Sequence, residues 1–189
     1  CDLTKDFGFG KLELIGTFAK SGDPRGAAAA HFDDSKWQQI NLPHDWAVDL
    51  PFVLDNTLVW HGGKPLGRAY PETSIGWYRK NFSIPAADLG KRIRIRFDGV
   101  YRNAQVFLNA QYLGQHTGGY APFEYDVTDF LNYGGDNVLA LRVDATYAEG
   151  WFYEGAGIYR HVWLTKTAPV HIASWGNYVQ SSFKSGIKG

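Results

Sequence analysis

The sequence predicts an all-β fold, an antiparallel β-sandwich, and three observations support this prediction. Apolar and polar residues alternate over several short segments, which is the pattern of a strand with one buried face. Turns rich in glycine and asparagine separate these segments at short intervals. No window of a dozen residues keeps apolar positions at helical spacing without meeting glycine or proline. Short strands without intervening helices are typical of two packed antiparallel sheets.

The elements follow in chain order. Residues 21–30 are expected to form a surface loop with one helical turn, and residues 50–71 a long loop. Residues 92–97 (RIRIRF) are a clear strand, because isoleucine and phenylalanine occupy one face and arginine the other. The full set of expected strands is residues 76–84, 92–97, 104–108, 138–143 and 161–165. Asn109 and Ala110 are expected to form a turn with positive φ, at a cost of about 1 kcal/mol for the alanine Cβ.

The C-terminal end indicates a domain boundary. Ala168-Pro169 ends the pattern, and residues 170–174 and 178–183 are expected to form two more strands. These strands either pair with the main sandwich or begin a second domain that the chain does not contain. We therefore expect one domain over residues 1–168, followed by an incomplete segment over residues 169–189.

Composition excludes several classes of function. Lys plus Arg and Asp plus Glu are 19 each, so the chain lacks the basic field with which most proteins bind nucleic acid. No apolar run is long enough to span a membrane. The single cysteine, Cys1, excludes an intramolecular disulfide and a cysteine-based zinc site, and the six histidines lack metal-ligand spacing. We expect no cofactor and no metal ligand in this chain.

Cys1 has two interpretations. It is either only the boundary of the chain or the lipid-bearing first residue of a mature bacterial lipoprotein. The second interpretation predicts a periplasmic, cell-surface or secreted protein, and the alternative location is the cytoplasm.

The residues that could form a functional site are carboxylates, histidines and aromatic residues. Aromatic residues make up 16% of the chain, enough to fill a core and still offer rings to an amphipathic ligand such as a sugar. Three pairs of carboxylates lie close together in the sequence: Asp33/Asp34, Asp126/Asp129 and Glu149/Glu154. The first two are expected to cap turns. Glu149 and Glu154 flank an aromatic stretch and are expected to contact a ligand rather than to act as a catalytic pair. His44 is expected to be a hydrogen-bonded loop histidine, and the alternative is a functional histidine oriented by Asp45.

Four ordered blocks carry a resemblance to a known family. These are residues 32–48 (FDDSKWQQINLPHDWAV), 76–85 (GWYRKNFSIP), 97–131 (FDGVYRNAQVFLNAQYLGQHTGGYAPFEYDVTDFL) and 151–164 (WFYEGAGIYRHVWL). Together they resemble the N-terminal domain of glycoside hydrolase family 2, which includes β-galactosidases, β-glucuronidases and β-mannosidases. The resemblance implies a jelly-roll sandwich of the galactose-binding-like type, followed by an immunoglobulin-like domain that begins within residues 169–189. It also implies a TIM barrel with both catalytic glutamates, which this chain lacks.

The resemblance also implies a site. In β-galactosidases of this type, an acidic residue ahead of the block at residues 152–160 reaches the sugar site, and Glu149 is the nearest match. The expected substrate-binding residues are Glu149, Trp151, Tyr153 and Glu154, with no catalytic residue in the chain. The expected partners are a β-galactoside and the missing barrel, in a parent enzyme that is a retaining β-glycosidase and a candidate homo-oligomer. The resemblance leaves open whether that enzyme binds a magnesium or sodium ion. Two alternatives are an independent carbohydrate-binding module and a structural or oligomerisation domain.

Overall fold

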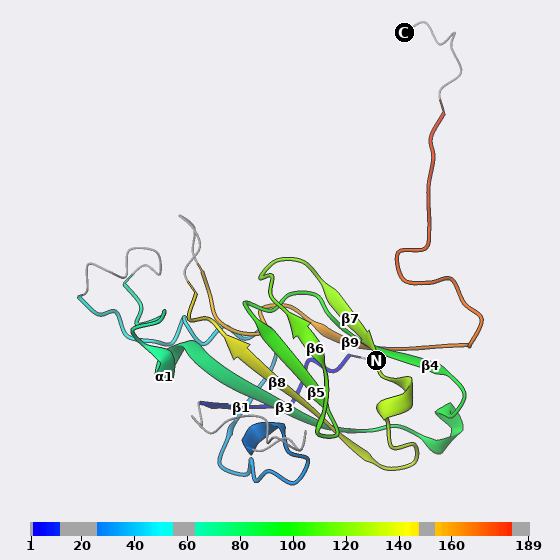
Figure 1. The fold of residues 1–189 in the computed structure, drawn as a ribbon, viewed down its shortest axis with the longest axis horizontal. Helices are drawn as coiled ribbons and strands as arrows, with labels where there is room; N and C mark the ends of the chain where they lie inside the picture. Colours follow the sequence, from blue (N-terminus) through cyan, green and yellow to red (C-terminus); the bar gives the residue numbers. More distant parts are fainter. Residues whose placement is uncertain (1, 12–25, 55–62, 148–153, 183–189) are drawn as a thin grey trace, which may run out of the picture.

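The fold is a sandwich of two antiparallel sheets. The computed structural model describes residues 2–11, 26–54, 63–147 and 154–182 (Figure 1). The larger sheet has the strand order β2-β1-β3-β8-β5-β6 and the smaller one β7-β4-β9. The strands are β1 (Phe7–Lys11), β2 (Gln38–Ile40), β3 (Ile75–Ser83), β4 (Arg92–Phe97), β5 (Ala104–Leu108), β6 (Gln111–His116), β7 (Phe123–Asp126), β8 (Asp136–Asp144) and β9 (Val162–Thr167).

Helical structure is confined to short turns. The described residues contain one four-residue helix, α1 (Pro71–Ser74), and the 3-10 turns η1 (Gly26–Ala28), η3 (Ala86–Asp88) and η4 (Thr128–Phe130). The described parts of the loop expected at residues 50–71 contain no strand or helix before α1. Within the described ranges, no helix has the length and apolar character needed to cross a membrane. The predicted all-β, jelly-roll type of fold is confirmed.

The main core lies between the two sheets, and alternation along the strands fills it. In β4, Ile93, Ile95 and Phe97 are fully buried, while the arginines between them are partly exposed. The same core receives Tyr78 of β3 and Leu141 of β8 from the facing sheet. Burying large apolar side chains of this kind contributes roughly 1.5–3 kcal/mol each. The core therefore holds the two sheets face to face.

A second, smaller cluster covers the outer face of the larger sheet. Trp77 of β3 and Phe107 of β5 point away from the main core and are buried beneath η1 and the residues that follow it. Arg79 fixes this covering segment, because its guanidinium donates to the carbonyl oxygens of Ala27 and Ala29 at 2.6 and 2.9 Å and to Asp34 at 2.8 Å. The expected helical turn within residues 21–30 is thus η1, held against the sheet by a buried arginine.

The C-terminal residues leave the sandwich. Residues 168–182 form no strand or helix, and Figure 1 shows the far end of this segment running away from both sheets. Val170 is 93% exposed and Tyr178 is 86% exposed. The described parts of the two strands expected after Pro169 therefore do not pair with the sandwich. The boundary at residue 168 stays a prediction.

Candidate functional site

Residues 154–158, part of the block expected to carry the site, are tied between two other segments. Tyr101 and Gly157 exchange a pair of backbone hydrogen bonds, with N···O distances of 2.8 and 2.7 Å. On the other side, the backbone of the loop at residues 44–47 donates two hydrogen bonds to carbonyls of residues 154–158, at 2.8 and 3.0 Å. The segment is therefore held from both sides at one end of the sandwich.

Asp45 reinforces this tie with its side chain. Its Oδ1 accepts hydrogen bonds from the backbone N–H of Ala156 at 2.8 Å and of Ala47 at 2.9 Å. A Cβ at position 155 would collide with the Asp45 carboxylate, which explains why glycine stands at Gly155. Through these two hydrogen bonds, Asp45 joins the loop at residues 44–47 to the tied segment.

Gly157 occupies a position that only glycine fits. Its φ is +132°, a region that residues with a side chain rarely adopt. A Cβ there would also collide with the Tyr78 hydroxyl and the His44 carbonyl oxygen. The two glycines of the Gly-Ala-Gly sequence are thus required for different reasons. Gly155 is required by the close approach of Asp45, and Gly157 mainly by its backbone conformation.

His44 and Tyr78 form the floor beneath the tied segment. His44 Nδ1 and the Tyr78 hydroxyl lie 2.8 Å apart, and Tyr78 is fully buried. Burial raises the pKa of Tyr78 well above its usual value. Burial also lowers the pKa of His44, against the opposing charges of Asp49 and Asp45. The prediction that His44 is a hydrogen-bonded loop histidine is confirmed, with Tyr78 as its hydrogen-bond partner.

The structure places one of the four expected substrate-binding residues. Glu149, Trp151 and Tyr153 lie outside the described residues. Glu154 is buried, and its carboxylate faces the hydroxyl of Tyr101. Burial first, and then this carboxylate, raise the pKa of Tyr101 above its usual range. Glu154 therefore helps to position Tyr101, and its contact with a sugar stays a prediction.

A cavity of about 190 Å³ opens beside the tied segment. Its lining combines three tyrosines, one carboxylate and the backbone of the tied segment: Asp45, Tyr101, Tyr120, Gly155, Ala156 and Tyr159. Tyr159 is fixed by its hydroxyl, which donates to the carbonyl oxygen of Gly119 at 2.7 Å. Tyrosine rings beside hydrogen-bonding groups suit a ligand with both apolar faces and hydroxyls.

Sequence reasoning missed most of this lining. Asp45, Tyr101 and Tyr120 lie within the resembling blocks at residues 32–48 and 97–131, but nothing in those blocks marked them as site residues. The sequence feature that pointed to this site was the block at residues 151–164, which includes Tyr159. Of the residues that the structure describes, no three His, Cys, Asp or Glu side chains gather closely enough to hold a metal ion.

The two sheets and the segment tied across their end define a β-sandwich domain of the jelly-roll type. Residues 33–168 match the family model described as glycosyl hydrolases family 2, sugar binding domain. The chain belongs to this family.

The curated relatives are much longer than this chain, which matches only a small part of each. It is 46% identical over 162 residues to the β-galactosidase BoGH2A of Bacteroides ovatus, a match that covers 85% of this chain and 18% of that protein. It is 38% identical over 142 residues to a putative β-glucuronidase of Formosa agariphila, covering 75% of this chain and 13% of that protein.

Solved structures of glycoside hydrolases show the same similarity. A glycosyl hydrolase family 2 member from Bacteroides cellulosilyticus superposes with a TM-score of 0.78 at 35% identity, over 93% of this chain and 21% of that one. A β-glycosidase from Bacteroides vulgatus superposes with a TM-score of 0.75 at 35% identity, over 91% of this chain and 20% of that one. The chain thus spans about a fifth of the length of these relatives.

Proposed function

We propose that this chain is the non-catalytic N-terminal domain of a retaining β-glycosidase of the β-galactosidase type. In this proposal the end of the sandwich at residues 154–159 forms one wall of the sugar pocket and supports a catalytic barrel outside this chain. The observation that carries it is the tie between residues 154–158, the loop at residues 44–47 and Tyr101. That tie holds the block that resembles the family's sugar-facing segment, and it holds it beside a tyrosine-lined cavity.

The chemistry of the cavity supports a sugar as the ligand. A hexose presents C–H groups on its ring faces and hydroxyls around its edge. The rings of Tyr101, Tyr120 and Tyr159 can contact the former. Hydroxyls and carbonyls at the rim can hydrogen-bond the latter, at roughly 0.5–1.5 kcal/mol for each bond. The relatives named above carry the names of a β-galactosidase and a putative β-glucuronidase.

Asp45 at this cavity and Glu154 next to the lining residue Gly155 both support a non-catalytic role. A retaining glycosidase needs a nucleophile and an acid held about 5–5.5 Å apart, both free to meet the glycosidic bond. Asp45 accepts two backbone hydrogen bonds, and Glu154 is buried against Tyr101. Both carboxylates have structural contacts at this end of the sandwich, which supports assigning bond cleavage to groups outside this chain.

The test is Glu149→Gln in the full-length enzyme. This change removes a negative charge five residues before Glu154 and keeps the shape of the side chain. We expect kcat/KM for a nitrophenyl β-galactoside to fall about tenfold, equivalent to about 1.4 kcal/mol, with unchanged thermal stability. Glu72→Gln, at an exposed glutamate of α1, is the matched control and should leave kcat/KM unchanged. An unfolded domain with normal kinetics in the surviving enzyme would instead make Glu149 structural.

A second measurement tests whether this chain is non-catalytic. The 189-residue chain alone should not hydrolyse a nitrophenyl β-galactoside above background. Turnover by the chain that is lost on changing Glu149 or Glu154 would refute the non-catalytic role.

A further inference from the structure

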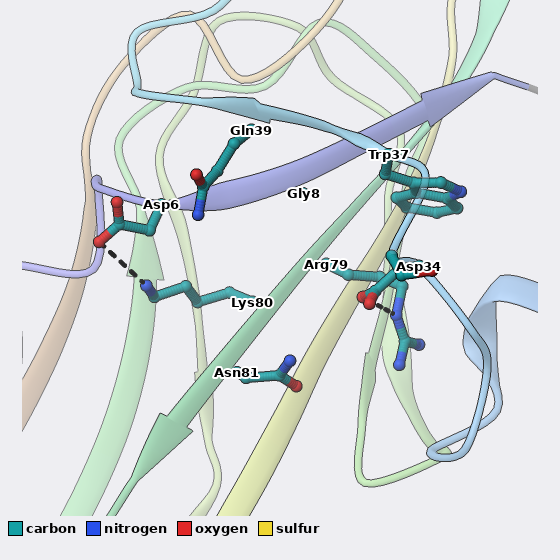
Figure 2. Close-up of a pocket in the computed structure, with 9 residues that line it drawn as sticks. Asp6, Gly8, Asp34, Trp37, Gln39, Arg79, Lys80 and Asn81 are labelled. Atoms are coloured by element: carbon teal, nitrogen blue, oxygen red, sulfur yellow. Dashed lines mark hydrogen bonds and ion pairs between the residues drawn. The ribbon is translucent and has the colours of Figure 1, made fainter.

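A second cavity, of about 470 Å³, lies on the outer face of the larger sheet (Figure 2). It crosses β2, β1 and β3 and shares no lining residue with the cavity beside Tyr159. Its volume falls in the range of small-molecule sites, about 300–1,000 Å³. Gly8 of β1 and Arg79 of β3 are register partners beneath it, so the strand backbone forms part of its floor.

One end of this cavity is an aromatic wall. Trp37 lies over β1 at Gly10, where a Cβ would stand only 2.7 Å from the indole Nε1. The absence of a side chain at Gly10 therefore allows the indole to lie close against the sheet. Phe32 supports the ring, with centroids 5.4 Å apart. A half-buried indole fixed in this way presents apolar surface at little conformational cost.

The rest of the cavity offers both donors and acceptors of hydrogen bonds. Figure 2 shows Trp37 and Asp34 on one side, Asp6 and Lys80 on the other, and Gln39 and Asn81 between them. Gln39 and Asn81 are exposed amides, each able to donate and to accept. A sugar hydroxyl also does both, so an amide can meet it in either direction.

The charges in the cavity compensate one another. The Arg79 guanidinium forms an ion pair with Asp34 and donates hydrogen bonds to carbonyl oxygens of the covering segment. Lys80 Nζ lies 3.9 Å from an oxygen of the Asp6 carboxylate. The second pair is loose, with the Asp6 side chain 68% exposed and the Lys80 side chain 15% exposed. The 3.9 Å separation is longer than a hydrogen bond, so a ligand hydroxyl can bind the exposed Asp6 carboxylate without breaking a short contact. A cavity with paired charges favours a neutral ligand over an anion.

We propose that the cavity formed by Trp37, Gln39, Lys80, Asn81 and Asp6 binds a neutral hexopyranose unit of a carbohydrate chain. The indole contacts the apolar face of the sugar ring, and the two amides and the loose ion pair bind its hydroxyls. The domain would then hold carbohydrate on its outer face, independently of the proposed pocket wall near Tyr159.

The experiment is an amide NMR titration of the 189-residue chain with lactose and with cellobiose, and with glucuronate as the charged comparison. We expect saturable shifts in β1, β2 and β3 with the neutral sugars, and weaker binding of glucuronate. Removing one hydrogen-bonding side chain costs about 0.5–1.5 kcal/mol. Gln39→Ala and Asn81→Ala should therefore each weaken binding about two- to tenfold. Gln111→Ala, at an exposed glutamine of β6 in the same sheet, is the control and should change nothing.

A second variant tests the site by filling it. A Cβ at Gly8 would make ordinary contacts, 3.5 Å from the Arg79 carbonyl oxygen and 3.7 Å from the Trp37 ring. Gly8→Leu should thus fold and abolish the saturable shifts by occupying the floor of the cavity. The proposal is overturned if Gly8→Leu binds as well as the parent chain, if no saturable shift occurs, if the shifts gather around Tyr159 instead, or if glucuronate binds more tightly. None of these outcomes bears on the Glu149→Gln kinetics, which depend on other residues.

Discussion

Ala110 shows, at the scale of one residue, a local conflict that the fold tolerates. Asn109 and Ala110 connect β5 to β6 with φ of 51° and 69°. Asparagine adopts the left-handed region readily, whereas the alanine Cβ is strained there by about 1–2 kcal/mol. Asn109 compensates with its side chain, which donates to Phe130 O at 2.8 Å and accepts from Val138 N at 2.9 Å. The expected positive φ at this turn is confirmed.

Ala110→Gly should therefore stabilise the domain. Glycine removes the strain of the Cβ and adds some entropy to the unfolded chain, so we expect a net gain of about 1 kcal/mol in the free energy of unfolding. Urea denaturation measures it. Gly90→Ala is the matched control, because Gly90 has φ +89° and a Cβ there would meet no described atom within 4 Å. It should lose a similar amount, and equal signs for the two changes would contradict the explanation by φ.

His44 makes stability depend on pH. Burial lowers the pKa of His44, and burial also lowers the pKa of His116. The unfolded chain, whose histidines titrate near pH 6.5, then binds protons before the folded one does. The free energy of unfolding should consequently fall as the pH drops from about 7.5 to about 5. Asp88 and Asp126 also have lowered pKa values, but their contribution is lost only at lower pH, near and below the usual carboxyl range.

The variant His44→Asn separates this effect from the rest. Asparagine can still hydrogen-bond the Tyr78 hydroxyl but does not titrate, so the decline between about pH 7.5 and about pH 5 should become shallower. His31→Asn changes an exposed histidine and serves as the control. Chemical denaturation at several pH values measures both. An unchanged slope in His44→Asn would remove His44 from the explanation.

The tied segment at residues 154–158 is the element on which the candidate site depends. Gly157→Ala should destabilise the domain by about 3 kcal/mol or more, because it combines backbone strain with collisions at Tyr78 and His44. Gly135→Ala is the control, since its Cβ would approach only Asn132, at 3.8 Å. Thermal and urea unfolding of both variants measure the difference. Near-equal losses would mean that the tie contributes little to stability.

The elements differ in how far sequence could predict them. Residues 92–97 and 104–108 were predicted with the bounds that β4 (Arg92–Phe97) and β5 (Ala104–Leu108) have, because their inward faces are continuous and apolar. β1 was missed because glycines interrupt its pattern, and those glycines stand where Trp37 covers the sheet. β6 was missed because it is an edge strand, largely polar and partly exposed, and so lacks a buried face.

The candidate site was less accessible to prediction than the strands. The block containing Glu154 and Tyr159 could be found from sequence, because its glycines and aromatics lie close together in the chain. The role of Asp45 could not, because its partner Ala156 is distant in sequence and meets it only through the packing of the two sheets. Local patterns carry no information on such a contact. The cavity on the outer face has the same origin, in strands that are neighbours only in space.

For the whole molecule, the described C-terminal segment should behave as a separate, open part of the chain. Over residues 170–182 as described, one backbone hydrogen bond is present, from Gly176 N to Ala173 O at 2.9 Å. Trp175 and Ser174 contact the sandwich through side chains, which do not protect backbone amides. Hydrogen exchange should therefore be fast from about Val170 and slow in β9 within the same experiment. Strong protection of this segment in a dilute monomer would assign it to the sandwich.

The order of strands in the larger sheet has a consequence for synthesis on the ribosome. β3 lies between β1 and β8, and its whole length, Ile75 to Ser83, pairs with Asp136 to Asp144. At about 5–20 residues per second, β3 therefore emerges several seconds before the strand that completes its ladder. During that interval the nascent chain carries Trp77 and Tyr78 on a strand with one unpaired edge, the kind of surface that chaperones bind and that otherwise aggregates. Translation that stalls before residue 136 would leave this strand open on every copy of the chain.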